Sequence, residues 1–378
     1  MEIVLTDDQE FFRDTTRKFL GSECPIPKVR ELRGNADGFE PAYWRQGAEL
    51  GWISMLVPEE LGGGSVSGNG ASDLALVADA FGSHVAPGPL LPCSVVATAL
   101  ARSGSEQQQS EVLPALIAGE QIATWADTEL PPNDRRGTTT LRAEADGDGY
   151  VLTGLKSPVE AGAQADQLLV TAHTDAGHTQ FLVPADADGL TVTPLRSVDL
   201  VRRYARIRFD GVKVAASALV GEAGAAAADV EAQLRVAGVI QSAEMVGAAD
   251  SAFDITLDWA FSRYSFGRPL ASYQEIKHRF ADMKMWLEAS HGLADSAARH
   301  VSRDDDGAAI AASAAKAYAG QYLAELVQDC VQLHGGIGVT YEHDLHLFLR
   351  RITVDRLTYG TPTDHHRRIG ALRIAQAA

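Results

Sequence analysis

Three long alanine-rich runs toward the C-terminal end constrain the fold of this chain more than any other feature. They cover residues 228–264, 273–302 and 308–333, and Leu, Ile, Val and Met recur in them at intervals of three and four. This spacing places the apolar side chains on one face of an α-helix. Long helices with such a face bury it against one another, so the sequence predicts a helical bundle over residues 226–378.

The segment from residue 1 to residue 120 is also predicted to be helical. Thr6 is a suitable N-cap because the residues that follow it are acidic and complement the dipole of a helix. Phe11, Phe12 and Phe19 then recur at the spacing of one helix face. We therefore expect an N-terminal helical domain.

The segment from residue 121 to residue 225 has a different pattern. Short strand-like runs alternate there with turn sequences at residues 146–149, 175–177 and 210–211. Asp and Gly between two such runs are typical of β-hairpins. The complete order is helical, then β, then helical, and the predicted fold class is a multi-domain α+β protein.

Composition excludes several classes of function. The 378 residues contain 33 Lys and Arg against 50 Asp and Glu, a formal net charge of −17, which argues against nucleic acid or an anionic membrane surface as the main partner. No run approaches the length of an uncharged apolar membrane span, and the acidic start does not resemble a secretory signal. Cys24, Cys93 and Cys330 form neither a disulfide framework nor a metal-binding spacing. We expect a soluble cytoplasmic enzyme without a metal.

Several motifs, in their order along the chain, resemble the acyl-CoA dehydrogenase family. Leu-Gly-Trp at residues 50–52 precedes Val-Pro-Glu-Glu-Leu-Gly-Gly at residues 57–63. Arg-Tyr-Ser-Phe-Gly-Arg-Pro-Leu follows at residues 263–270, and Gln-Leu-His-Gly-Gly-Ile-Gly at residues 332–338. The resemblance implies a β-barrel-like middle domain between two helical domains, the second of them a four-helix bundle. It covers nearly the whole chain.

The same resemblance implies the chemistry. Members bind FAD without a covalent bond and oxidise an acyl-CoA thioester between its α and β carbons: a carboxylate takes the α proton and the β hydrogen leaves as hydride. The flavin supplies the redox chemistry, and the protein supplies orientation, a base and electrostatics. Electrons usually pass to an electron-transfer flavoprotein. Members assemble as homo- or hetero-oligomers, in dimers or tetramers.

Residues that match the FAD contacts of the family lie in the C-terminal part. They are Arg263, Phe266, Gln274, Gln332, Gly335 and Gly336. The resemblance implies that Arg263 contacts the pyrophosphate and that Phe266 lies at the adenosine side, often across a subunit interface. Glycines at the end of the third helical run would also permit positive φ and a close approach of backbone to phosphate.

The middle segment departs from the family pattern. A flavin-contacting segment that usually reads Thr-Glu-Pro followed by Gly-Ser-Asp has no Gly-Ser part here, at residues 128–134. A second segment usually places a Trp and a hydroxyl against the flavin ring. In this chain it covers residues 156–160, and Pro158 and Glu160 stand at those two positions. The ring would have to be held differently, mainly by backbone groups.

The catalytic base is the second departure. The two positions at which family members carry the glutamate fall on Gly360 and Ala237, and neither has a proton acceptor. Glu244 lies close to two helical turns after Ala237, so it shares that face of the helix. Its neighbours in the sequence are apolar, and apolar surroundings raise the pKa of a carboxylate toward the range of a general base. Glu244 is therefore the candidate base.

Three functions remain open from the sequence. The first is a catalytic acyl-CoA dehydrogenase that uses Glu244 and FAD, similar to actinobacterial members that act on bulky substrates such as steroid side-chain thioesters. The second is a partner subunit without a base of its own, in a heteromeric enzyme, which the losses at Ala237, Gly360 and Pro158 would permit. The third is an acyl-CoA oxidase, although those enzymes are usually longer.

Overall fold

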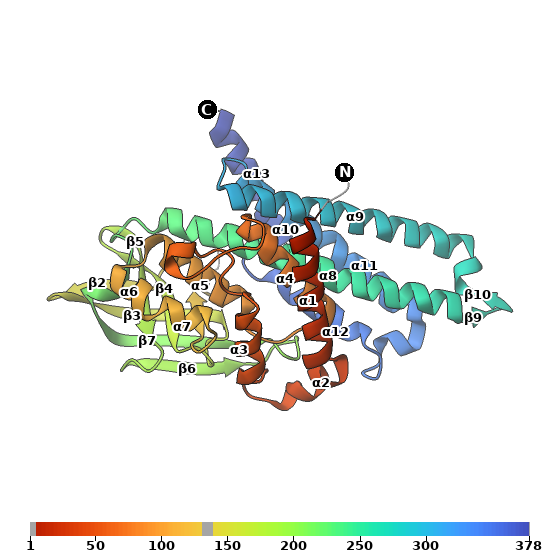
Figure 1. The fold of residues 1–378 in the computed structure, drawn as a ribbon, viewed down its shortest axis with the longest axis horizontal. Helices are drawn as coiled ribbons and strands as arrows, with labels where there is room; N and C mark the ends of the chain where they lie inside the picture. Colours follow the sequence, from red (N-terminus) through yellow and green to blue (C-terminus); the bar gives the residue numbers. More distant parts are fainter. Residues whose placement is uncertain (1–4, 131–138, 378) are drawn as a thin grey trace.

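The computed structural model describes residues 5–130 and 139–377. The chain forms a helical part, a sheet and a second helical part, and the long helices α8 (Ala227–Ser262) and α9 (Gln274–Arg303) run away from the sheet toward the far end of the molecule (Figure 1). The predicted α+β class, with helical domains on either side of a sheet domain in the sequence, is confirmed.

The N-terminal part is helical, as the sequence predicts. Its helices are α1 (Asp7–Glu23), α2 (Ile26–Glu31), α3 (Pro41–Glu49), α4 (Gly70–His84), α5 (Leu90–Ser103), α6 (Glu106–Glu111) and α7 (Leu113–Ile117). The hydroxyl of Thr6 accepts a hydrogen bond from the backbone N–H of Gln9, and the Gln9 side chain accepts one from the backbone N–H of Thr6. This reciprocal pair is a capping box, and the predicted start of the first helix is confirmed. Trp52 is buried edge-on against Phe81 in the core.

The middle part is an eight-stranded sheet over the described residues. Its strands are β1 (Ala123–Ala126), β2 (Arg142–Asp146), β3 (Gly149–Glu160), β4 (Gln167–Thr174), β5 (Gly177–Pro184), β6 (Leu190–Leu195), β7 (Tyr204–Ala215) and β8 (Leu219–Val220). Hydrogen-bonded neighbours follow the order β6-β7-β3-β2-β4-β5-β8, and β1 pairs with β4 in parallel. The sheet has a hydrophobic core of its own.

Two of the three predicted turns join strands, and the third does not. The turns at residues 146–149 and 175–177 link β2 to β3 and β4 to β5 in antiparallel pairs. Asp210 and Gly211 lie within β7 instead, so the hairpin expected there is wrong. Thr153 of β3 pairs with Asp210 and the preceding residue of β3 pairs with Val212, which leaves Gly211 as the extra residue of a β-bulge. Its φ of +68° is one that glycine adopts easily, and β-bulges often use it.

The C-terminal part contains the predicted long helices with one interruption. After α9 come α10 (Ala308–Tyr318), α11 (Ala324–His334), α12 (Leu345–Leu357) and α13 (Pro362–Ala377). The third alanine-rich run is not one continuous α-helix, because a π-helical segment at Ala319–Leu323 separates α10 from α11. A short hairpin of β9 (Tyr264–Ser265) and β10 (Arg268–Pro269) joins α8 to α9.

Helices α4 and α8 touch through their backbones. A Cβ atom on Gly82 would lie 1.9 Å from the carbonyl oxygen of Glu244, and one on Gly247 would lie 2.0 Å from the carbonyl oxygen of Asp79. Only glycine leaves room for this approach at both positions. One hydrophobic core accordingly spans the N-terminal and C-terminal helices.

We expect the Gly247→Ala substitution to lower the free energy of unfolding by about 1–3 kcal/mol, because the added methyl group must push α4 and α8 apart. Gly292→Ala is the matched control: Gly292 is an exposed residue of α9, and its Cβ would meet nothing within 4 Å. Helix propensity alone should make the control more stable, by up to about 1 kcal/mol. Chemical denaturation of both variants checks this, and equal stabilities would show that the helix contact imposes no steric limit.

Candidate functional site

A group of buried charges lies where the helices meet the sheet domain. Arg351 of α12 donates from Nη1 to Oε1 of Glu244 at 2.5 Å and from Nε to Oδ2 of Asp199 at 2.6 Å. Arg202, just before β7, donates from Nη2 to the other carboxylate oxygen of Glu244 and from Nη1 to Oδ1 of Asp355 at 2.5 Å. We call Glu160, Asp199, Arg202, Glu244, Arg351 and Asp355 the buried ion network. All six side chains are almost completely buried.

The network contains four carboxyl groups but only two guanidinium groups, so not all of its acids can be ionised at low energetic cost. Burial raises the pKa of Asp355 to about 8, and the nearby Glu244 and Glu160 add to the effect against the attraction of Arg202. Burial also raises the pKa of Glu160. Burial would raise the pKa of Asp199 too, but its ion pair with Arg351 dominates and lowers this pKa to about 2. We infer that Asp355 retains a proton near neutral pH, since its pKa is raised to about 8.

Unsatisfied oxygen atoms agree with the raised pKa values of Asp355 and Glu160. Oδ2 of Asp355 and Oε2 of Glu160 are buried without a hydrogen-bond partner among the described residues. A neutral carboxylic acid tolerates such a position better than an ionised one, because burying an unpaired charge costs far more than burying a polar group. The unpaired oxygen atoms and the raised pKa values therefore single out the same two carboxyl groups, Asp355 and Glu160.

The expectation that the Glu244 carboxylate lies in apolar surroundings is wrong. Its neighbours in the sequence are apolar, but the side chain is 1% exposed and each of its oxygens is bound by an arginine. These arginines lie far from Glu244 in the sequence and come from the segment before β7 and from α12. Its role as a catalytic base remains a prediction, and the structure gives this carboxylate the position of an ion-pair partner.

The two other positions considered for the base are enclosed by different groups. Ala237 is fully buried in α8. The carbonyl oxygen of Gly360 accepts a hydrogen bond from Nζ of Lys316 at 3.2 Å. Beside it, the ring of Tyr359 stacks on Trp125 of β1 with centroids 5.2 Å apart and planes at 10°. Aromatic rings therefore fill the space between this loop and the sheet.

The middle-domain residues do not fit a flavin ring in the manner of the family. Glu160, at the position of the family hydroxyl, is buried with Oε1 3.6 Å from Nε of Arg202. Pro158 offers no donor at the position of the family indole. Lys156 and Glu129 form a buried ion pair of 2.8 Å, so they hold each other. Residues 131–134 of the other flavin-contacting segment lie outside the described residues. A buried, orphaned carboxyl oxygen on Glu160 is a poor neighbour for a ring that gains negative charge on reduction.

The six predicted FAD residues lie at the opposite end of the long helices. Arg263 lies over the ring of Trp259 at 5.6 Å, and Trp259 stacks on His334 with centroids 5.0 Å apart. This chain of contacts places Arg263 near the glycine turn that starts at Gly335. Gly335 has φ +64°, as the sequence predicts, and a Cβ on either Gly335 or Gly336 would meet nothing within 4 Å.

The side chains at this end are open to solvent. We call Arg263, Phe266, Gln274, Gln332, Gly335 and Gly336 the helix-tip residues, and all of them are exposed. Phe266 is 97% exposed on the β9–β10 hairpin and has a positive φ of 50°. An exposed guanidinium beside an open glycine turn fits a pyrophosphate, since both supply donors that phosphate oxygens accept. The helix-tip residues thus fit the adenosine and pyrophosphate half of FAD, whereas the sheet side does not fit the ring.

Sequence reasoning missed Asp199, Arg202, Arg351 and Asp355. The sequence does carry a signal for two of them. Arg351 and Asp355 lie four residues apart on α12, among apolar residues such as Phe348 and Ile352. Charges on the apolar face of a helix must find partners when that face is buried. Nothing in the local sequence indicates that Glu244 and Arg202 are those partners.

The network predicts a pH dependence of stability. The pKa of Asp355 is 3.8 in its ordinary state and about 8 in the fold, so between these values the folded chain holds a proton that the unfolded chain has lost. The stabilisation from this group is complete below about pH 4 and is lost as the pH rises to about 8. Asp355→Asn keeps the acceptor for Arg202 and has no proton to lose. Melting temperatures from pH 5 to pH 9 should therefore fall less steeply with pH in Asp355→Asn than in the wild type.

Asp186→Asn serves as the control because this carboxylate is exposed. It should leave the slope of melting temperature against pH unchanged. Parallel curves for the wild type and Asp355→Asn would contradict the inferred proton on Asp355.

Comparison with known proteins agrees with the architecture. The model of the acyl-CoA dehydrogenase N-terminal domain matches residues 6–120, and that of the C-terminal domain matches residues 212–375. Acyl-CoA dehydrogenase FadE27 of Mycobacterium tuberculosis is 29% identical over 98% of both chains. Acyl-CoA dehydrogenase IpdE2 of Mycolicibacterium smegmatis is 27% identical over 97% of this chain and 99% of its own.

Solved structures have the same fold. The ChsE4–ChsE5 complex of Mycobacterium tuberculosis matches with TM-score 0.87 and 29% identity over 98% of both chains. A variant of the Tcur3481–Tcur3483 steroid ACAD matches with TM-score 0.87 and 28% identity, over 98% of this chain and 99% of that one. A glutaryl-CoA dehydrogenase from Mycobacterium smegmatis, solved with FADH2, matches with TM-score 0.85 and 25% identity, over 99% of this chain and 96% of that one. No helix in the described part of the chain is long and apolar enough to cross a membrane. The chain therefore belongs to the acyl-CoA dehydrogenase family of oxidoreductases.

Proposed function

We propose that this chain is a subunit of a FAD-dependent acyl-CoA dehydrogenase in which a second, homologous chain supplies the catalytic base. One observation carries the proposal: each carboxylate oxygen of Glu244 is bound by a buried arginine. A proton accepted by either oxygen would displace a guanidinium and leave it buried without its partner, which is strongly unfavourable. A general base must also come within hydrogen-bond reach of the substrate, and Glu244 is 1% exposed.

The helix-tip residues supply the part of the FAD site that this chain retains. Arg263 would pair with the pyrophosphate, and the open turn at Gly335 and Gly336 lets backbone come close to it. Phe266 exposes nearly its whole ring, and a solvated ring of that size is stabilised by stacking against a partner or a ligand. These contacts would reach an FAD whose ring lies in the partner chain.

The assembled enzyme would oxidise an acyl-CoA to its 2-enoyl-CoA. The carboxylate of the partner chain takes the α proton, and FAD, when bound, supplies the acceptor for the β hydrogen, which leaves as hydride with its electron pair. An electron-transfer flavoprotein would then receive the electrons. Two relatives of this fold support a heteromeric enzyme for a bulky acyl group, since one is the ChsE4–ChsE5 complex and the other is a steroid ACAD.

Flavin content tests the proposal directly. We expect the chain purified alone to be colourless and inactive, and to yield a yellow, active complex when co-expressed with a homologous chain that carries the family glutamate. In that complex Glu244→Gln should lower turnover by less than about tenfold, because loss of a general base typically costs about 10²–10⁴-fold. Absorbance of oxidised flavin and turnover of acyl-CoA thioesters are the measurements.

A different result in the same experiment would contradict the proposal. A yellow chain that turns over acyl-CoA alone, and loses at least about a hundredfold of that rate as Glu244→Gln, would identify Glu244 as the base and overturn the proposal. The melting temperature of Glu244→Gln, measured in parallel, separates a loss of chemistry from a loss of folded protein.

The helix-tip residues give an independent prediction. We expect Arg263→Gln to weaken the affinity of the complex for FAD by about tenfold or more, because a charge-assisted contact to the pyrophosphate is lost. Arg206→Gln removes another exposed charge, from the sheet domain, and should leave FAD affinity unchanged. Titration of the flavin-free complex with FAD checks this, and equal affinities of the two variants would exclude a pyrophosphate contact by Arg263.

A further inference from the structure

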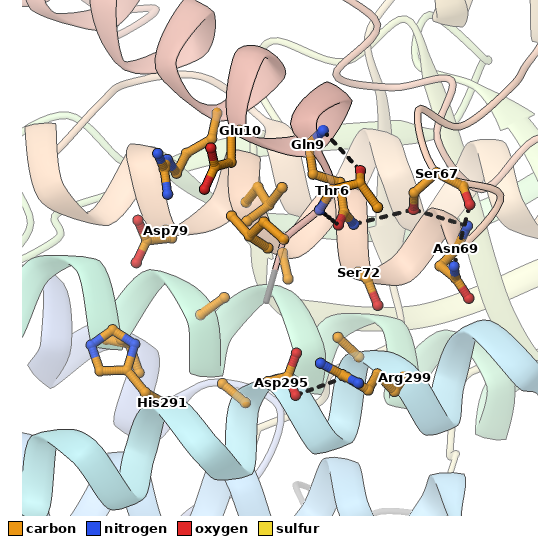
Figure 2. A pocket seen from close by; sticks show the side chains of 18 of the residues that line it. Thr6, Gln9, Glu10, Ser67, Asn69, Ser72, Asp79, His291, Asp295 and Arg299 are labelled. Atoms are coloured by element: carbon orange, nitrogen blue, oxygen red, sulfur yellow. Dashed lines mark hydrogen bonds and ion pairs between the residues drawn. The ribbon is translucent and has the colours of Figure 1, made fainter. Parts of the chain in front are cut away.

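A groove of about 500 Å³ lies between α1, α4 and α9, with α8 at its base. Figure 2 shows the N-cap Thr6 and Gln9 and Glu10 of α1 on one side. His291, Asp295 and Arg299 of α9 lie on the other. Ala243 and Val246 of α8 reach into the groove, while Glu244 between them bonds to the buried ion network. The groove is thus separate from both the network and the helix-tip residues.

The base of the groove is apolar and made of small side chains. It consists of Ala75, Leu76, Ala243, Val246, Ala294 and Ala298. Four of these six residues are alanines on packed helices, and their short side chains create the space between the helices. A volume of about 500 Å³ lies within the range of small-molecule sites, roughly 300–1,000 Å³. An apolar chain or ring system would bury surface along this base.

The balance of charged side chains that line the groove is opposite in sign to the net charge of the whole chain. Its walls carry Arg13, Arg17, Arg299 and Arg303 against Glu10, Asp79 and Asp295, with His291 in addition. The entire sequence has 33 basic against 50 acidic residues. The lining is therefore positive in balance within a strongly acidic protein, and an anion would be favoured here over most of the surface.

The positive charge is concentrated at one end. Arg17 is paired with Asp79 at 2.6 Å and Arg13 with Asp14 at 2.9 Å. At the other end, Nε of Arg299 lies 2.8 Å from Oδ2 of Asp295.

The neighbouring Arg303 forms no ion pair within the described part of the chain. The acids that follow it are engaged elsewhere, Asp304 with Arg102 and Arg235 and Asp305 with His300. The hydroxyl of Ser72, which lies near Arg299 in Figure 2, is buried without a partner among the described residues.

We propose that this groove binds an amphipathic carboxylic acid, with its carboxylate at Arg299 and Arg303 and its apolar part along the alanine base. Guanidinium groups bind carboxylates through paired, charge-assisted hydrogen bonds, and the free hydroxyl of Ser72 can donate a further one. The acyl carboxyl group of a CoA thioester is bound to sulfur and carries no charge, so the ligand we propose is a free acid. The site needs neither flavin nor a partner chain and is independent of the function proposed above.

Calorimetric titration of the full chain with sodium decanoate tests the site, with 1-decanol as the uncharged comparator. The double variant Arg299→Gln/Arg303→Gln should weaken decanoate binding by about tenfold or more and change decanol binding little. Both arginines are exposed, so this variant is expected to fold. Ala75→Leu, which fills part of the groove, should weaken both ligands. Arg206→Gln/Arg208→Gln removes two exposed charges from β7 and should change neither.

Three results would overturn the proposal. A decanoate affinity that neither the arginine double variant nor Ala75→Leu changes would show that decanoate binds elsewhere. Equal loss of decanoate and decanol in the arginine variant would show that the carboxylate is not recognised. Absence of saturable decanoate binding to the wild-type chain would exclude the site altogether.

Discussion

The contacts of Arg351 hold together parts of the chain that are far apart in the sequence. Its guanidinium binds Asp199 beside the sheet and Glu244 of α8, and it donates to the carbonyl oxygen of Ala86, which follows α4, at 3.1 Å. One side chain therefore connects the N-terminal helices, the sheet domain and the C-terminal helices. A buried guanidinium stays favourable only while its partners remain in place, so the relative positions of the three parts depend on this network.

The same constraint limits what the chain can do chemically. A carboxylate that holds two arginines in the interior cannot also exchange protons with a substrate without breaking those ion pairs. Once Glu244 has this structural role, it no longer offsets the absence of a carboxylate at Ala237 and Gly360. The aromatic stack of Tyr359 on Trp125 agrees with this, since it fills the space beside Gly360. The Glu244 carboxylate can serve either as a partner of two buried arginines or as a catalytic base, but not as both.

Much of the fold follows from local patterns in the sequence. Helical periodicity, the capping box at Thr6 and two of the Asp-Gly turns depend on residues that are close in the chain, and the structure confirms them. The predictions that are wrong concern features that depend on residues far apart in the sequence. Whether Gly211 forms a turn or a bulge depends on the partner strand β3, which continues past it. The surroundings of Glu244 depend on arginines that the fold brings from two other elements, so its sequence neighbours indicated an apolar site where the structure has an ionic one.

The location of charge also decides between functions that net charge alone leaves open. A chain of net charge −17 repels anions on average, yet its arginines are not distributed evenly. Arg202 and Arg351 neutralise buried acids, Arg263 is exposed beside an open glycine turn, and Arg299 and Arg303 face a groove with an apolar base. Each setting gives the same side chain a different role: a buried arginine stabilises the fold, and an exposed one with few acidic partners is available to an anionic ligand. We therefore expect anion recognition by this chain to depend on which arginines the fold leaves exposed with few acidic partners.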